Sequence, residues 1–242
     1  MFKDYANVLI KDISKINTNT YKNKYNWNYI LYLDTKNITN NTINHVKKYT
    51  SKDNIPNRAK RIVKKNDIII STVRPIQEHY GILREIPKNL LVSTAFVVIS
   101  PNNNIVDNDY LYYFLTQKYI TKSLQDIAEQ GTTSYPSITR KDIENIELVL
   151  PSLKYQRQIS HILRNIDKKI ATNKKINKNL NSLLRSLFKH WIINYQIPKS
   201  FNINHTYRET KKYESIEMPD DWVIFNFKDK CNFIKGKKPK NI

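Results

Sequence analysis

One segment near the carboxyl end of the chain carries apolar residues at the spacing of a long helix. From Ile159 onward these positions, together with two asparagines, recur alternately four and three residues apart. They are Ile159, Leu163, Ile166, Ile170, Asn173, Asn177, Leu180, Leu184, Leu187 and Trp191. This is the heptad spacing of a coiled coil, and no proline or glycine occurs between Pro151 and Pro198, so the pattern predicts one helix over 153–195. Such a helix is roughly 60 Å long and needs a partner along its apolar side.

The preceding part of the chain mixes short apolar runs with one amphipathic stretch. Strand-like runs lie at 7–16, 29–33, 66–75, 90–100 and 145–151. The run at 90–100 is apolar nearly throughout and predicts one strand buried on both faces. Asp107 is placed to cap a helix that continues to about Ala128, and a turn-rich loop is expected at 131–143. This irregular order predicts an α+β fold: a globular mixed α/β domain over 1–152, then the long coiled-coil-type helix.

The composition changes again after the long helix. Residues 196–217 are predicted to form a linker, and 218–242 to begin a second domain. The string NFKDKCNF (226–233) resembles LIKDISKI (9–16), because both place an apolar residue four positions after a Lys-Asp pair. The offset is that of one domain plus the long helix, so the chain is predicted to begin a second copy of its first domain.

Charge is the second strong feature of the sequence. The formal net charge is +20, and residues 153–195 hold 10 basic residues against one acidic residue, Asp167. An excess of this size favours a polyanionic partner, with nucleic acid ahead of an acidic membrane. The alternative is compositional, because a chain rich in Lys, Asn, Ile and Tyr is what AT-rich coding sequence produces.

The sequence shows no pattern of a self-contained enzyme. It has no GxGxxG, Walker A or nucleophile-elbow motif, and its five histidines and single Cys231 are dispersed without metal-ligand spacing. An adenine methyltransferase would need a glycine-bearing cofactor loop and an Asn/Asp-Pro-Pro-aromatic motif. We therefore expect no catalytic residues, metal or bound cofactor, and the absence of a long apolar run predicts a soluble, cytoplasmic protein.

Candidate nucleic-acid contacts gather in three parts of the first domain. Arginine suits guanine edges and phosphates because its planar group donates two parallel hydrogen bonds, and hydroxyl groups suit phosphate oxygens. The candidates are Arg58, Arg61, Arg74, His79, Tyr80, Arg84, Thr132, Thr133, Ser134, Arg140 and Lys141. The alternative for each is a place on a solvated rim or in a turn, and we favour a structural role for Tyr135 and Pro136.

A set of strings in fixed order resembles a known family. They are ISTVRP (70–75), HYGIL (79–83), STAFVVI (93–99), YLYYFL (110–115), GTTSYPSITRKDIENIELVLP (131–151), QRQIS (156–160) and SLFKHW (186–191). In order and spacing they resemble the specificity subunit of type I restriction–modification systems over about residues 7–195. The resemblance implies a target recognition domain that reads half of a split DNA site, a long spacer helix, and a second copy of both.

The resemblance also implies partners. Double-stranded DNA is the ligand, methyltransferase subunits dock on paired antiparallel helices, and methyltransferase and restriction subunits bring AdoMet, ATP and Mg²⁺. Because the chain ends early in the second domain, it is expected to be either a natural half-length subunit or a truncated one. A half-length subunit is predicted to form a homodimer through the long helix, with Asn173 and Asn177 near the two-fold axis. The competing interpretations are a coiled-coil scaffold protein with a protein-binding globular head and a stand-alone DNA methyltransferase or nuclease.

Overall fold

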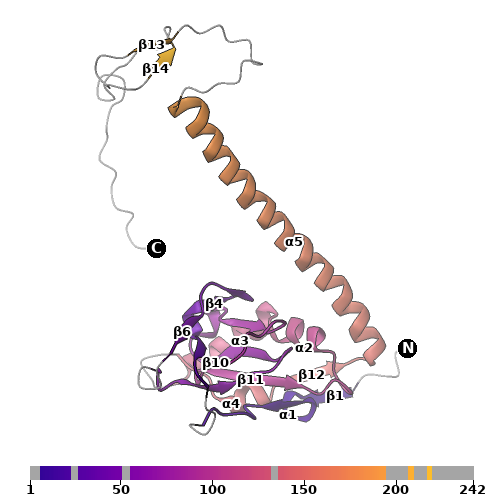
Figure 1. The fold of residues 1–242 in the computed structure, drawn as a ribbon. Coiled ribbons are helices and arrows are strands. Elements are labelled where there is room, and N and C mark those ends of the chain that lie inside the picture. Colours follow the sequence, from indigo (N-terminus) through magenta and orange to yellow (C-terminus); the bar gives the residue numbers. More distant parts are fainter. Residues whose placement is uncertain are drawn as a thin grey trace. The chain divides into compact units, whose positions relative to one another are not determined.

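The computed structural model describes residues 6–22, 27–50, 55–131 and 136–194, and the backbone of 207–209 and 217–219. The chain divides into two units, and the boundary falls between Asp167 and Lys168 in the sequence of the long helix. In the first unit, β1 (Ala6–Leu9) pairs antiparallel with β12 (Glu147–Leu150). This pairing brings the two ends of the globular part together, and Figure 1 shows the two strands side by side.

The first of two four-stranded sheets has the order β2-β11-β8-β9, and all its pairs are antiparallel. Its strands are β2 (Ser14–Ile16), β11 (Phe96–Pro101), β8 (Ile68–Ser71) and β9 (Tyr80–Ile82). The short helix α1 (Ile10–Ile13) leads from β1 into β2. Because successive side chains of a strand point to opposite faces, β8 is buried on both: Ile68 and Ile70 pack on one side and Ile69 on the other.

The second sheet has the order β6-β3-β10-β7. Its strands are β6 (Lys47–Tyr49), β3 (Ile30–Leu33), β10 (Leu90–Ser93) and β7 (Ala59–Ile62), and only the β3–β10 pair is parallel. Leu90 and Val92 face a core shared with Phe96 and Val98 of the first sheet. Leu91 faces the other way, into a smaller cluster where Tyr21 and Trp27 pack.

Two helices cover the outer face of the first sheet. They are α2 (Asn108–Leu115) and α3 (Lys118–Glu129), drawn beside the sheet in Figure 1, and their apolar residues join the largest core cluster. Asp107 caps α2 as predicted, because its carboxylate accepts a hydrogen bond from the Tyr110 backbone at 3.0 Å. The layers are therefore two helices, two sheets and an aromatic cluster on the far face of the second sheet.

A hairpin of β4 (Ile38–Thr39) and β5 (Thr42–Ile43) lies against β9. Its two turn residues, Asn40 and Asn41, have φ of 42° and 59°, as a tight primed hairpin turn requires. The Asn41 side chain accepts from the Ile82 backbone at 2.9 Å. Gly81 admits this contact, because a Cβ there would lie 2.9 Å from the Asn41 side-chain oxygen.

Several predicted boundaries need correction. The run at 90–100 forms two strands in different sheets, β10 and β11, which are joined by a turn at Thr94 and Ala95. The helix predicted from 107 to 128 is broken into α2 and α3 at Thr116–Gln117. The loop predicted at 131–143 contains α4 (Arg140–Glu144), and the strand predicted at 66–75 is shorter, since Pro75 lies in a 3₁₀ turn, Pro75–Gln77.

The long helix is confirmed as α5 (Leu153–Phe188), and it ends in a π-helical turn, Lys189–Ile193. In the second unit, β13 (Tyr207–Glu209) and β14 (Glu217–Pro219) pair antiparallel. The repeat predicted at 226–233 and most of the predicted second domain lie outside the described residues.

Candidate nucleic-acid interface and helix seam

Backbone hydrogen bonds join the segments that carry Arg58, Arg74 and Arg140, and Arg61 lies close enough to Arg140 for the two charges to interact. The Thr94 amide donates to the Arg58 carbonyl, and the Thr72 amide donates to the Ala95 carbonyl, both at 2.8 Å. From Thr72 the connection continues to the segment before α4, since the Ile138 amide donates to the Thr72 carbonyl and the Arg74 amide to the Pro136 carbonyl. We call the resulting set the basic edge: Arg58, Arg61, Arg74 and Arg140.

The basic edge holds more positive charge than its carboxylate partners neutralise. Burial lowers the pKa of Arg61, and the nearby Arg140 guanidinium lowers it further. Arg140 is paired with Glu144 one helical turn later, at 2.6 Å. Arg61 Nε is buried and has no hydrogen-bond acceptor among the described residues. A buried guanidinium donor without an acceptor carries a desolvation cost, and a nearby anionic ligand would offset the repulsion between the Arg61 and Arg140 charges.

The backbone at Arg74 fixes where that residue sits. Arg74 has φ of 47° and ψ of 70°, a left-handed conformation that few non-glycine residues adopt, and it precedes the 3₁₀ turn Pro75–Gln77. The turn is attached to α3, because the Ile76 amide donates to the Gln125 side-chain oxygen at 3.1 Å. The strained residue is therefore held between α3 and the segment at 136–138.

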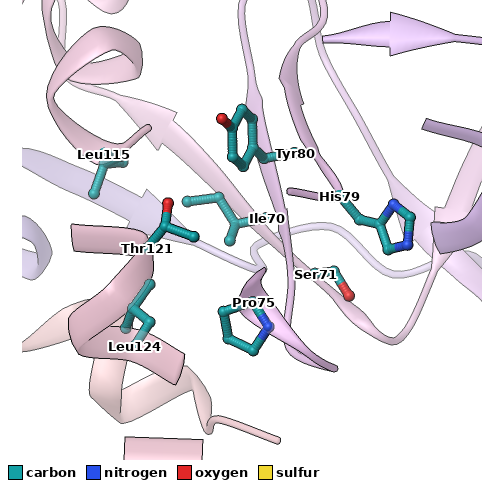
Figure 2. Close-up of a pocket in the computed structure, with 8 residues that line it drawn as sticks. All are labelled: Ile70, Ser71, Pro75, His79, Tyr80, Leu115, Thr121 and Leu124. Atoms are coloured by element: carbon teal, nitrogen blue, oxygen red, sulfur yellow. The ribbon is translucent and has the colours of Figure 1, made fainter. Parts of the chain in front are cut away.

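His79 and Tyr80 both make contacts within the fold. Figure 2 shows their side chains pointing in different directions from neighbouring positions. Tyr80 is 7% exposed, stacks edge-on against Tyr112, and burial raises its pKa to about 12. His79 Nδ1 lies 2.6 Å from the Ile38 carbonyl oxygen and so holds the β4–β5 hairpin. The cavity beside them measures about 10 Å³, which is room for about one water molecule and no ligand.

Arg84 also has a structural partner. Its guanidinium forms a salt bridge with Asp109 of α2, and Arg164 of α5 approaches the second oxygen of the same carboxylate at 3.2 Å. Lys141 is exposed on α4 beside Arg140. Thr132, Thr133 and Ser134 lie outside the described residues.

A polar stripe on the first turns of α5 attaches the helix to α2. We call Gln156, Ser160, Arg164 and Asp167 the docking stripe. Gln156, which is 1% exposed, accepts from the Asp107 amide at 2.8 Å and donates to the Pro151 carbonyl at 2.7 Å. Ser160 donates to the Asp107 carboxylate at 2.6 Å, and Tyr113 donates its hydroxyl hydrogen to Asp167 at 2.7 Å.

Sequence reasoning did not single out this stripe, although a signal was present. The spacing of its four residues, four, four and three apart, places them on one face of a helix, beside the apolar heptad positions. The string QRQIS, which carries part of the family resemblance, contains Gln156 and Ser160, the two buried members of the stripe.

The ten predicted heptad positions, which we call the seam, are mostly exposed. Ile159, Ile170 and Leu184 have exposed fractions of 42%, 47% and 64%, while Leu163, Leu187 and Trp191 are half-buried. Asn173 and Asn177 are exposed as well. Monomeric soluble proteins rarely leave a continuous apolar stripe of this length in water.

The part of the chain that the structure describes shows neither a group of metal-ligating side chains nor a membrane-spanning helix. No group of three or more His, Cys, Asp or Glu side chains is arranged to hold a metal ion there. None of the helices in these ranges has the length and apolar content needed to cross a membrane.

Comparison of the sequence with known proteins finds relatives over most of the chain. The family model described as the type I restriction modification DNA specificity domain matches residues 3–182. The type I restriction enzyme HindI specificity subunit of Haemophilus influenzae is 31% identical over 197 residues, which are 79% of this chain and 41% of that protein. The MjaVIII specificity subunit of Methanocaldococcus jannaschii is 32% identical over 154 residues, 62% of this chain and 32% of that protein.

Solved structures agree in fold. The HsdS subunit of Thermoanaerobacter tengcongensis superposes with a TM-score of 0.62 at 21% identity, over 77% of this chain and 48% of that one. A chain from a study of complex assembly and conformational transition of the type I R-M system superposes with a TM-score of 0.61 at 21% identity. The match covers 81% of this chain and 50% of that one. The chain spans about half the length, or less, of these relatives. Because the family model matches well over half of the sequence, the chain belongs to the type I restriction modification DNA specificity domain family.

Proposed function

We propose that this chain supplies sequence specificity for a type I restriction–modification system by binding one half of a split site in double-stranded DNA. The observation that carries the proposal is the basic edge, where Arg61 has a buried donor without an acceptor close to a second guanidinium. Phosphate oxygens and guanine edges are the acceptors that suit such a pair. Arg58 and Arg74 extend the same edge on either side of the Thr94–Ala95 turn.

We assign one role to each of the predicted segments. Residues 1–152 form the recognition domain, 153–195 the spacer helix, 196–217 a linker, and 218–242 the start of a second recognition domain. A split site needs two recognition domains held at a fixed distance, and the relatives are about twice as long as this chain. The seam supports a homodimer, in which two copies of α5 pair antiparallel and the apolar positions cover one another.

The proposed partners include the catalytic subunits. Methyltransferase subunits dock on the paired helices and restriction subunits join that assembly, so AdoMet, ATP and Mg²⁺ belong to these subunits. The uncompensated basic residues of α5 add long-range attraction for DNA around the assembly. The competing function is a coiled-coil scaffold whose globular part binds protein, and the closeness of the Arg61 and Arg140 charges favours DNA over this alternative.

A salt titration of DNA binding tests the proposal. The affinity of the chain for duplex DNA is measured by fluorescence anisotropy at a series of salt concentrations. Neutralised phosphates release counterions, so the logarithm of the association constant should fall linearly with the logarithm of salt concentration, with a slope of about −0.9 per phosphate contact. A scaffold protein would show weak binding with a shallow slope, and that result would overturn the proposal.

A further inference from the structure

The second sheet carries an open groove. It measures about 490 Å³ and runs between β3, β6 and the segment before β7. Its lining residues are Tyr32, Asp34, Lys36, Asn37, His45, Lys47, Tyr49, Pro56, Asn57 and Arg58. Arg58 belongs to both the groove and the basic edge, so the two features share one residue. The sequence had singled out only Arg58 among these residues.

The groove combines a cationic rim with an aromatic floor. Lys36, Lys47 and Arg58 are exposed cations, against one carboxylate, Asp34. The Asp34 carboxylate is already engaged, because it accepts from the Thr35 amide at 2.8 Å and so caps a 3₁₀ turn. The floor holds Tyr32 and Tyr49, whose rings meet edge-on at 6.4 Å.

The position of Lys47 is set by its aromatic neighbour. Its ammonium lies 5.0 Å from the centre of the Tyr49 ring, two residues later on the same face of β6. Lys48 points to the opposite face of the strand, where it lies 4.8 Å from the centre of the Tyr29 ring. The two neighbouring lysines therefore have the same charge and the same kind of contact, but only Lys47 lines the groove.

We infer that this groove binds the sugar–phosphate backbone of one DNA strand, with Lys36, Lys47 and Arg58 as phosphate contacts. The inference rests on the proposed DNA-binding function and assigns part of it to a site. An open groove lined by three cations fits a polyanionic strand better than a small molecule, which an enclosed apolar pocket would hold. Amide groups of Asn37 and Asn57 in the same groove are placed to donate to phosphate or sugar oxygens.

The two lysines of β6 give a matched test. Duplex binding of the 242-residue chain is measured over a salt series for the wild type, Lys47→Ala and Lys48→Ala. Lys47→Ala should weaken binding to all duplex sequences alike and reduce the magnitude of the salt slope by about 1, while Lys48→Ala should leave the slope unchanged. Lys36→Ala added to Lys47→Ala should reduce the slope by about 2 in total.

The outcomes separate the inference from the proposed function. If the wild type binds clearly and the two substitutions change the salt slope equally, the groove is not the phosphate-binding site. The proposed DNA-binding function would be unaffected by that result. Absence of salt-dependent binding by the wild type would remove the proposed function and the groove together. Circular dichroism of each variant checks that the chain retains its fold, which both substitutions should preserve because both lysines are exposed.

Discussion

Arg164 Nη1 lies 3.2 Å from Asp109 Oδ2, and this contact joins the long helix to the globular part of the first unit. Asp109 also forms a salt bridge with Arg84. A carboxylate that is about 10% exposed therefore pairs with two cations from different segments. The attachment of α5 is thus polar, through the docking stripe. The consequence is that the apolar seam of the helix is not used for attachment and stays available to a partner.

Replacing Asp109 should therefore loosen the attachment. Asp109→Asn removes the charge that two guanidiniums share, and we expect a loss of about 1–3 kcal/mol in the free energy of unfolding, kept modest because both arginines are partly solvated. Urea unfolding followed by fluorescence measures the loss. Asp126→Asn, at an exposed position on α3, is the control and should be neutral. Equal stabilities would show that the ion cluster contributes nothing to the fold.

Gln156 allows a second test of the docking stripe with a neighbouring control. Gln156→Ala leaves the Asp107 amide and the Pro151 carbonyl without their partners in a buried place, so we expect a loss of about 1–3 kcal/mol. Gln158→Ala makes the same chemical change on an exposed face of the same helix and should cost little. Comparable midpoints of urea unfolding for the two variants would contradict the docking role.

The sequence predicts the long helix well, because heptad spacing is a local signal that no proline or glycine interrupts. It does not predict the breaks at Thr94–Ala95 and Thr116–Gln117, because neither break contains glycine or proline. Both depend on hydrogen bonds instead. The Thr116 hydroxyl donates to the Tyr112 carbonyl at 2.9 Å, and the turn after β10 is fixed by bonds to Arg58 and Thr72. The bonds to Arg58 and Thr72 exist only once the sheets have formed.

The arrangement of the candidate interface also could not be predicted from the sequence. Arg58, Arg74 and Arg140 are brought together by hydrogen bonds between segments far apart in sequence, so their proximity is not visible in a motif. Residue type alone also does not separate Arg84, which pairs with Asp109, from the arginines of the basic edge. Several strings that carry the resemblance have structural roles here. HYGIL anchors the β4–β5 hairpin, and QRQIS attaches α5.

Substitutions in the basic edge should weaken DNA binding. Arg61→Ala is expected to reduce the free energy of DNA binding by about 1–3 kcal/mol if its guanidinium makes a bidentate contact. Arg58→Ala or Arg74→Ala should reduce it somewhat less if each contacts a phosphate. Lys15→Ala, which removes one exposed charge on β2, is the control. Binding isotherms at fixed salt measure the differences. Unchanged affinity in all three arginine variants would contradict the basic edge as the DNA-binding surface.

The purified chain should transfer no methyl group to DNA when it is given AdoMet. The reason is that the sequence holds neither a glycine-bearing cofactor loop nor the catalytic motif of an adenine methyltransferase. Incorporation of labelled methyl groups into DNA measures the activity. Robust transfer by the chain without any partner would contradict its assignment as a specificity subunit.

The seam should mediate self-association. Leu180 and Leu184 are 56% and 64% exposed, and burying both against a second helix removes apolar surface from water. In an antiparallel pair, Asn173 and Asn177 would lie close to their own copies and fix the register. Leu180→Asp with Leu184→Asp places two charges in the seam, so the mass from light scattering should fall from dimer to monomer.

The control for this test lies on the same helix. Ser182→Asp with Ser186→Asp adds the same charge at the same spacing, away from the seam, so those variants should remain dimeric. A wild-type chain that is already monomeric, and that neither pair of substitutions changes, would rule out self-pairing. The seam would then be left to a methyltransferase subunit, because its exposed leucines still need a cover.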